Sequence, residues 1–250
     1  MKILIIGEYC TDRFVYGECN RICPEAPVPV FNPVGSKDNA GMAKNVFNNF
    51  LSINKGKYEV DFITNQNHIL KSRIVDIKTN QMLVRIDDND KCPPFDSLDQ
   101  LLNEDYDAIV ISDYNKGFLT EKSIEVLINE FPLSFVDSKK VFGKWLNKAS
   151  FVKINQSEYE KNKENLIDYK GQLIVTLGEK GVLWDNIVHP PSRQAEVSDL
   201  SGAGDTFLAA FVHSYLESKN IKSSIQFAQD CSLKVVEKKG VVVFKDDLDT

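Results

Sequence analysis

Residues 199–207 carry the side chains best suited to chemistry. They read Asp-Leu-Ser-Gly-Ala-Gly-Asp-Thr-Phe and run directly into an apolar stretch that predicts a helix. The small residues Gly202, Ala203 and Gly204 let a ligand approach the backbone, and the first N–H groups of a helix have no partner within it. Such a helix start is suited to bind phosphate. The alternative is a helix that merely begins after a glycine turn.

Asp205 lies in the first turn of this predicted helix, where the helix dipole favours a carboxylate. A carboxylate beside a phosphate site is also placed to take a proton from an attacking hydroxyl. The segment is therefore suited to phosphoryl transfer.

Apolar runs alternate with helical patterns through most of the chain, which predicts an α/β fold with a mainly parallel sheet flanked by helices. Strands are expected at 3–6, 58–64, 107–112, 134–137, 151–154, 173–177 and 181–184, and helices at 41–51, 120–130, 156–166, 204–218 and 221–237.

Two early parts of the chain do not fit such a sheet. Residues 12–34 hold four prolines, which allow edge strands or extended loop but no helix. In residues 69–77 and 81–86 apolar and polar side chains alternate, which predicts an antiparallel hairpin with one solvent-exposed face. We expect both parts, at about 12–34 and 69–87, to form a small β-sheet lid on a single domain spanning 1–250.

Composition excludes several classes of function. The net charge of −6 comes without a basic stripe, so we expect no nucleic-acid partner and no membrane partner. The apolar run near the N-terminus is too short for a signal sequence or a membrane span. Five cysteines form no CxxC pair, and the three histidines are not spaced with them as zinc ligands. These features predict a cytoplasmic protein with buried, inert thiols.

The sequence resembles a known family at the predicted helix start. Residues 199–205 match the D-x-x-G-A-G-D signature of the ribokinase/PfkB sugar kinases, which is far more specific than a lone glycine-rich loop. The resemblance implies a ribokinase-like, ATP-dependent kinase in which Asp205 is the catalytic base. It also implies that the amides of Gly202, Ala203 and Gly204 form the anion hole for the transferred phosphoryl group.

Two further stretches resemble the nucleotide side of this family. One is similar to its N-x-x-E stretch near ATP and Mg²⁺, and consists of Asn155, Gln156, Ser157 and Glu158. Glu158 is expected to hold Mg²⁺ through water, although the stretch by itself would be a helix cap. The other resembles the T-x-G-x-x-G turn, with Thr176, Gly178 and Gly181, and by itself is only a β-turn.

The N-terminal third resembles a subgroup, the bacterial heptose-7-phosphate kinases. Residues 21–30 read Arg-Ile-Cys-Pro-Glu-Ala-Pro-Val-Pro-Val, close to its R-I-S-P-E-A-P-V-P-V. The resemblance implies phosphorylation of D-glycero-D-manno-heptose 7-phosphate at C1. It also implies a set of substrate-binding residues: Asp12, Gly41, Asn45, Lys71, Arg73, Asp113 and Lys139. Asp12 and Asn45 would then hydrogen-bond sugar hydroxyls, and Lys71 and Arg73 would reach a phosphate from the lid.

Departures from the family pattern leave alternatives open. Met42 replaces a glycine and adds bulk where the sugar is expected. Residues 64–68 join a sheet strand directly to a lid strand, where the family usually has a further helix and strand. The alternatives are a kinase for another sugar, a nucleoside kinase, or a non-catalytic sugar- or nucleotide-binding relative. The match at 21–30 argues against a nucleoside kinase, because that stretch belongs to the heptose subgroup.

The sequence also predicts binding partners, an oligomeric state and the nature of the C-terminal segment. The small-molecule partners implied are a sugar phosphate and ATP. Exposed lid strands are edges that can pair with a second copy, so we expect a homodimer through the lid. The charged run 245–250 is expected to be solvated. We expect no nucleotidyltransferase domain of the kind that some heptose kinases carry.

Overall fold

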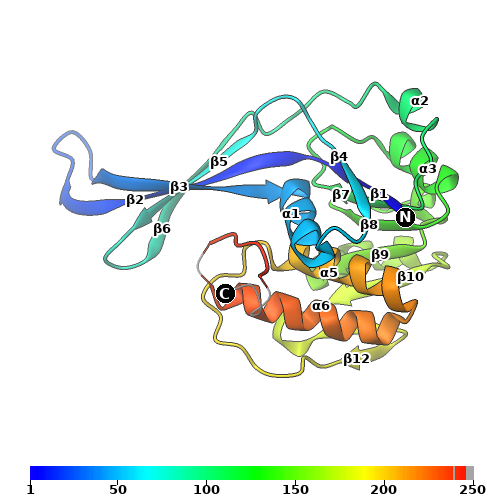
Figure 1. Cartoon of the computed structure of the whole chain (residues 1–250). Helices are drawn as coiled ribbons and strands as arrows, with labels where there is room; N and C mark the ends of the chain where they lie inside the picture. Colours follow the sequence, from blue (N-terminus) through cyan, green and yellow to red (C-terminus); the bar gives the residue numbers. More distant parts are fainter. Residues whose placement is uncertain (239, 246–250) are drawn as a thin grey trace.

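A computed structural model describes residues 1–238 and 240–245 of the chain. Its larger sheet, sheet A, has eight strands in the order β12-β11-β10-β9-β8-β7-β1-β4 (Figure 1). The strands of sheet A are β1 (Lys2–Gly7), β4 (Glu59–Ile63), β7 (Ala108–Asp113), β8 (Ser134–Ser138), β9 (Phe151–Asn155), β10 (Gln172–Thr176), β11 (Val182–Trp184) and β12 (Ile187–His189). From β4 to β10 all neighbours are parallel, which confirms the predicted α/β class.

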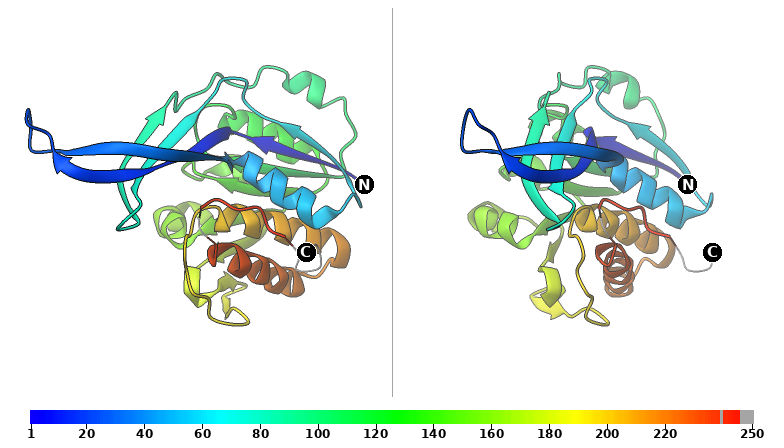
Figure 2. Two further views of the ribbon diagram at one scale, coloured as in Figure 1. Left: turned by 60° about the vertical axis from the view of Figure 1, so that its left-hand side comes forward. Right: turned by 90° about the vertical axis from the view of Figure 1, so that its left-hand side faces the viewer.

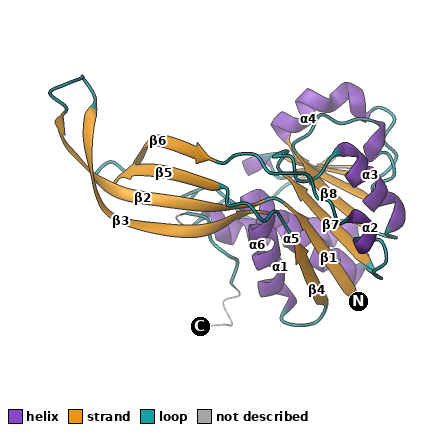
Figure 3. Ribbon diagram, turned by 90° about the horizontal axis from the view of Figure 1, so that it is seen from above, coloured by secondary structure: helices purple, strands orange, loops and turns teal. Residues whose placement is uncertain are grey.

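The strands of sheet A are apolar because helices cover both faces. In β1, Ile3 and Ile5 join one cluster of buried side chains, and Leu4 and Ile6 join the other. The first cluster is completed by α1 (Ala43–Asn54), α5 (Ala203–Ser218) and α6 (Ile221–Val236). The second is covered by α2 (Leu98–Leu101), α3 (Glu121–Glu130) and α4 (Gln156–Asn162) on the opposite side (Figure 3). Short 3₁₀ turns are η1 (Lys144–Leu146), η2 (Lys163–Leu166) and η3 (Gly178–Lys180).

The smaller sheet, sheet B, is the lid, and it projects as a long arm from the body (Figure 2). Its strand order is β3-β2-β5-β6, with β2 (Tyr9–Ile22), β3 (Pro29–Met42), β5 (Leu70–Asp76) and β6 (Gln81–Asp88). Pro29 and Pro33 lie on β3, an edge strand, which is where proline is tolerated in a sheet. The predicted hairpin is β5–β6, whereas β2 and β5 pair in parallel.

Several boundaries differ from those expected. The helix predicted from residue 41 begins at Ala43, because β3 stays paired with β2 through Met42. The helix predicted over 156–166 ends as an α-helix at Asn162 and continues as η2. The short elements α2 and β12 were not expected. Of the charged C-terminal run, residues 246–250 lie outside the described residues.

No helix in the described part of the chain is long and apolar enough to cross a membrane.

Candidate active site

The start of α5 stands at the carboxyl ends of the parallel strands, where open α/β sheets bind ligands. Gly202 precedes the helix with φ +82°, a left-handed conformation that favours glycine. A Cβ there would lie 2.6 Å from Nδ2 of Asn45. The glycine therefore permits both the turn and the close approach of α1. Of the predicted anion-hole amides, that of Ala203 donates to the carbonyl of Leu200 at 3.3 Å.

Asp205 is buried, and both of its carboxylate oxygens accept a hydrogen bond. The hydroxyl of Tyr114 donates to Oδ1 at 2.6 Å, and Nδ2 of Asn45 donates to Oδ2 at 2.9 Å. Asn49 donates to Oδ1 of Asn45 at 3.0 Å and so orients that amide. Burial raises the pKa of Asp205, while the hydrogen bonds from Tyr114 and Asn45 and the charge of Lys153 oppose the rise.

A cleft of about 520 Å³ opens in front of Asp205. Its walls come from the ends of β7, β8, β9 and β10 and from the start of α5. The residues that line it are Tyr114, Asp137, Lys139, Lys153, Asn155, Gln156, Ser157, Thr176, Leu177, Gly178, Leu200, Gly202, Gly204 and Asp205. The structure thus brings most of the predicted catalytic, anion-hole and nucleotide residues to one place. The three that do not line the cleft are Ala203 between its two glycine neighbours, Glu158 beside the cleft and Gly181 behind the turn.

Two lysines and two carboxylates form a charged cluster along the cleft. Nζ of Lys153 lies 2.6 Å from Oδ2 of Asp137, and Nζ of Lys139 lies 3.2 Å from Oδ1 of Asp137 and 2.6 Å from Oε1 of Glu158. Burial raises the pKa of Asp137, but the two ammonium groups outweigh it and the net shift is downward. Burial lowers the pKa of Lys139, but the carboxylates of Asp137 and Glu158 outweigh it and the net shift is upward. Both lysines lie beside the helix start, where they can meet phosphate oxygens.

Lys153 was missed by reasoning from the sequence. It lies within β9, an otherwise apolar strand, and its side chain is almost fully buried. A lysine inside such a run is costly unless it is paired, and that was the available signal. Its partner Asp137 lies on the neighbouring strand β8.

The start of α4 was predicted to bind nucleotide and Mg²⁺. Asn155 and Glu158 cap each other's backbone N–H groups at 2.9 Å, a reciprocal capping box. Each oxygen of Glu158 already accepts one partner, and a carboxylate oxygen has a further lone pair for a water. Among the described residues, no group of three or more acidic, histidine or cysteine side chains could hold a metal directly. These residues therefore fit a magnesium ion that keeps its waters and binds phosphate oxygens.

The turn after β10 completes the predicted nucleotide side. The hydroxyl of Thr176 donates to the carbonyl of Ile154 at 3.3 Å, which ties the ends of β10 and β9 together. Gly178 begins η3 at the cleft wall. Gly181 ends η3 and lies against the carbonyl of His189, on the β12 side of the turn.

The sugar-binding residues predicted near the lid meet at its base. Arg73 forms an ion pair with Asp12, across the parallel pair β2–β5. A side chain at Gly41 would overlap the carboxylate of Asp12, so glycine makes room for it there. Lys71 is buried and pairs with Asp87 and Asp90 of the lid. Asn45, on α1, donates to Oδ2 of Asp205.

Two predicted features lie elsewhere than expected. Asp113 is fully buried and pairs with Nζ of Lys140 at 3.1 Å, and it is not among the described residues that line the cleft. Met42 is buried and belongs to the same core cluster as Cys10 and Ile69. The bulk of Met42 is therefore directed into the core rather than into the cleft.

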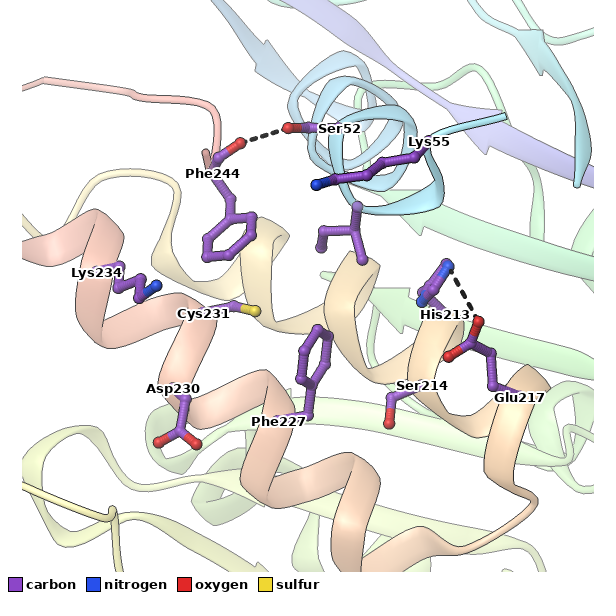
Figure 4. A pocket seen from close by; sticks show the side chains of 11 residues that line it. Ser52, Lys55, His213, Ser214, Glu217, Phe227, Asp230, Cys231, Lys234 and Phe244 are labelled. Atoms are coloured by element: carbon purple, nitrogen blue, oxygen red, sulfur yellow. Dashed lines mark hydrogen bonds and ion pairs between the residues drawn. The ribbon is translucent and has the colours of Figure 1, made fainter. Parts of the chain in front are cut away.

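Another cavity, of about 510 Å³, lies between α1, α5 and α6 (Figure 4). His213 lies 3.9 Å from Glu217 at one end, and Ser52 donates to the carbonyl of Phe244 at 2.6 Å at the other. Burial lowers the pKa of His213, which keeps the ring neutral near pH 7. Among the described residues that line this cavity, none belongs to the predicted site.

Known proteins resemble this chain in sequence and in fold. The Bifunctional protein HldE of Helicobacter acinonychis (strain Sheeba) is 31% identical over 294 residues, which cover 96% of this chain and 63% of the relative. The chain thus spans less than two thirds of that relative's length. The aligned stretch is longer than the 250 residues of this chain, so the relative holds segments that this chain lacks. This agrees with the expected shortening.

Solved structures show the same architecture. Ribokinase from Thermotoga maritima matches with a TM-score of 0.73 at 15% identity, over 96% of this chain and 94% of that one. Ribokinase from Cryptococcus neoformans var. grubii serotype A, solved in complex with ADP, matches with a TM-score of 0.69 at 13% identity, over 97% of each chain. At these identities the likeness concerns the fold, and it confirms the expected ribokinase-like sheet and lid.

A family model decides the class of protein. The model described as pfkB family carbohydrate kinase matches residues 95–247, a stretch that holds Asp205 and all of the described residues that line the cleft. The match confirms the expected class, the carbohydrate kinases. Because it covers more than half of the 250 residues, the chain belongs to the pfkB family of carbohydrate kinases.

Proposed function

We propose that this kinase transfers the γ-phosphoryl group of ATP to a hydroxyl of a phosphorylated sugar, and that the sugar is heptose 7-phosphate, phosphorylated at C1. The observation that carries the transfer is a buried carboxylate, Asp205, in the first turn of α5 at the head of the cleft. The choice of sugar is supported by the match at 21–30 and by the likeness to HldE.

In the proposed mechanism Asp205 takes the proton of the attacking sugar hydroxyl. The amides of Gly202 and Gly204 donate to the transferred phosphoryl group, because N–H groups at a helix start have no intrahelical partner. The amide of Ala203 would exchange its 3.3 Å bond to the carbonyl of Leu200 for a bond to the same group. Lys139 and Lys153 add positive charge on the same wall of the cleft. Mg²⁺, when bound with ATP and reached by Glu158 through water, supplies charge that offsets the phosphate oxygens.

The two substrates would enter from opposite sides of Asp205. The nucleotide would lie along α4 and the turn after β10, against Asn155, Gln156, Ser157, Thr176 and Gly178. The sugar phosphate would lie under the lid, near Asp12, Gly41, Asn45, Lys71 and Arg73. Closure of the lid over the sugar would exclude water and suppress hydrolysis of ATP.

The proposal includes a homodimer formed through the lid and a cytoplasmic location. Strand β6 is an edge strand whose residues are all exposed, among them Met82, Leu83, Val84 and Ile86. An apolar edge of this kind supports pairing with a second copy. All five cysteines are free thiols, which supports a reducing compartment.

The substitution Asp205→Asn tests the proposed transfer. We expect ADP release with heptose 7-phosphate to fall by about 10²–10⁴-fold, because the base is lost. The exposed Asp105→Asn is the matched control and should leave the rate unchanged. A panel of other phosphorylated sugars, assayed with the unchanged protein alongside heptose 7-phosphate, identifies the substrate. An Asp205→Asn variant with the rate of the unchanged protein would contradict the proposed base, and a higher rate with another sugar would contradict heptose 7-phosphate.

A further inference from the structure

Tyr114 is the first residue after β7, and its hydroxyl reaches across the cleft wall to Asp205. The 2.6 Å hydrogen bond joins residues that are 91 positions apart in the sequence. Asn45 approaches the other carboxylate oxygen from α1. Two donors from two different elements therefore fix both the position and the plane of the carboxylate.

The turn that carries Tyr114 is held in place by hydrogen bonds to Glu8. Both oxygens of this fully buried carboxylate accept backbone N–H groups of the turn, from Tyr114 at 2.7 Å and from Lys116 at 2.8 Å. The side chain of Asn115 accepts from Lys140 at 3.0 Å. The backbone of Tyr114 is thus anchored to the junction of β1 and β2. This fixes the Cα position from which the side chain of Tyr114 extends.

We infer that Tyr114 is a positioning residue for the base: its hydroxyl holds the Asp205 carboxylate in the orientation that accepts the proton of the substrate and favours its ionised form. The inference rests on the proposed role of Asp205. Each oxygen of the carboxylate keeps a lone pair beyond the one that its donor uses, so the bond from Tyr114 leaves room for the hydroxyl of the substrate.

The charged and titratable groups that face Asp205 set the sign of the expected pH effect. They are Tyr114 from the turn after β7, Lys153 from β9, Asp137 from β8 and Cys10 from β2. Burial raises the pKa of the Cys10 thiol, which stays neutral. Asp205 acts as a base only when it is ionised, so activity falls as the pH falls through its pKa. Loss of the Tyr114 bond raises that pKa and moves the fall in activity to higher pH.

The substitution Tyr114→Phe tests the inference because it removes only the hydroxyl. We expect kcat to fall by about tenfold or more, and the acid limb of the kcat profile to move up by about one pH unit, because a hydrogen bond to a charged group is lost. The KM for ATP should change little. The matched control is Tyr106→Phe, since Tyr106 donates to the carboxylate of Asp61 at 2.7 Å and lies before β7, at the opposite end of that strand from Tyr114.

A direct titration makes the test independent of turnover. The carboxyl ¹³C signal of Asp205, assigned with Asp205→Asn, should titrate at higher pH in Tyr114→Phe than in the unchanged protein or in Tyr106→Phe. An unchanged titration and an unchanged kcat profile in Tyr114→Phe overturn the inference. If Asp205→Asn keeps full activity, the proposed base is wrong, whereas an inactive Asp205→Asn beside an unaffected Tyr114→Phe overturns only the role of Tyr114.

Discussion

Asp205 combines burial with a hydrogen bond on each carboxylate oxygen. The two effects act in opposite directions on its pKa: burial raises it, and the donors lower it. A base of this kind works best when its pKa lies near the operating pH. The nearby pair of Lys153 and Asp137 places a further positive and a further negative charge beside the carboxylate. The residues around Asp205 therefore set the pKa of the proposed base.

Met42 offers a test of backbone strain at a single residue. It has φ +57° and ψ −138° directly before α1, a conformation that favours glycine. Both Met42→Gly and Met42→Ala lose the buried side chain, but only glycine relieves the strain. We therefore expect the glycine variant to be more stable than the alanine variant by about 1 kcal/mol in urea unfolding. The opposite order, which is usual inside helices, would contradict the strained backbone.

At the scale of elements, the start of α4 has two separate uses. The capping box of Asn155 and Glu158 satisfies N–H groups that a helix start leaves without partners. The same carboxylate also pairs with Lys139 at the cleft. One local motif therefore stabilises a helix and places charge near the proposed nucleotide and metal.

The substitution Glu158→Gln separates these two uses. Glutamine can still cap the helix, so the free energy of unfolding should change by less than about 1 kcal/mol. The loss of charge should raise the Mg²⁺ concentration for half-maximal activity by several-fold. Glu160→Gln on the same helix is the control, because Glu160 pairs only with the exposed Lys163 among the described ion pairs. An unchanged Mg²⁺ dependence in Glu158→Gln would rule out its proposed metal role.

At the scale of the whole molecule, the lid is an arm with little core of its own. At its base the strands of the lid are tied to one another, by the ion pair of Asp12 and Arg73 and by the pairs of Lys71. Its outer strand β6 leaves apolar side chains exposed. Exposed apolar strand edges are liable to pair with another chain. A second copy would cover these side chains and would stiffen the arm over the sugar.

The substitution Val84→Lys tests this proposed dimer. A charge on the exposed strand opposes edge pairing, so sedimentation should show a dimer for the unchanged protein and a monomer for the variant. Val141→Lys is the control, since Val141 is an exposed valine outside the lid. A monomeric unchanged protein, or a Val84→Lys variant that stays dimeric, would contradict pairing through β6.

Much of the fold was predictable because it follows from local patterns. Apolar runs such as 3–6 and 107–112 predicted buried strands, and the cap at Thr120 predicted the start of α3, where its side chain accepts from the N–H of Ser123. The α2 and β12 elements were missed because they are short and carry little periodicity. The parallel pairing of β2 with β5 was missed because local alternation does not identify the partner of a strand.

The sequence by itself determined the segments of the site: the helix start at Asp205, the cap at Asn155 and the turn at Gly178, because each depends on residues that are close along the chain. Only the tertiary structure decided what surrounds Asp205. Tyr114 and Asn45 reach it from 91 and 160 positions away. It also decided that Met42 packs into the core and that Asp113 is buried beside Lys140. Such contacts depend on strand order and helix placement, which no local pattern of residues specifies.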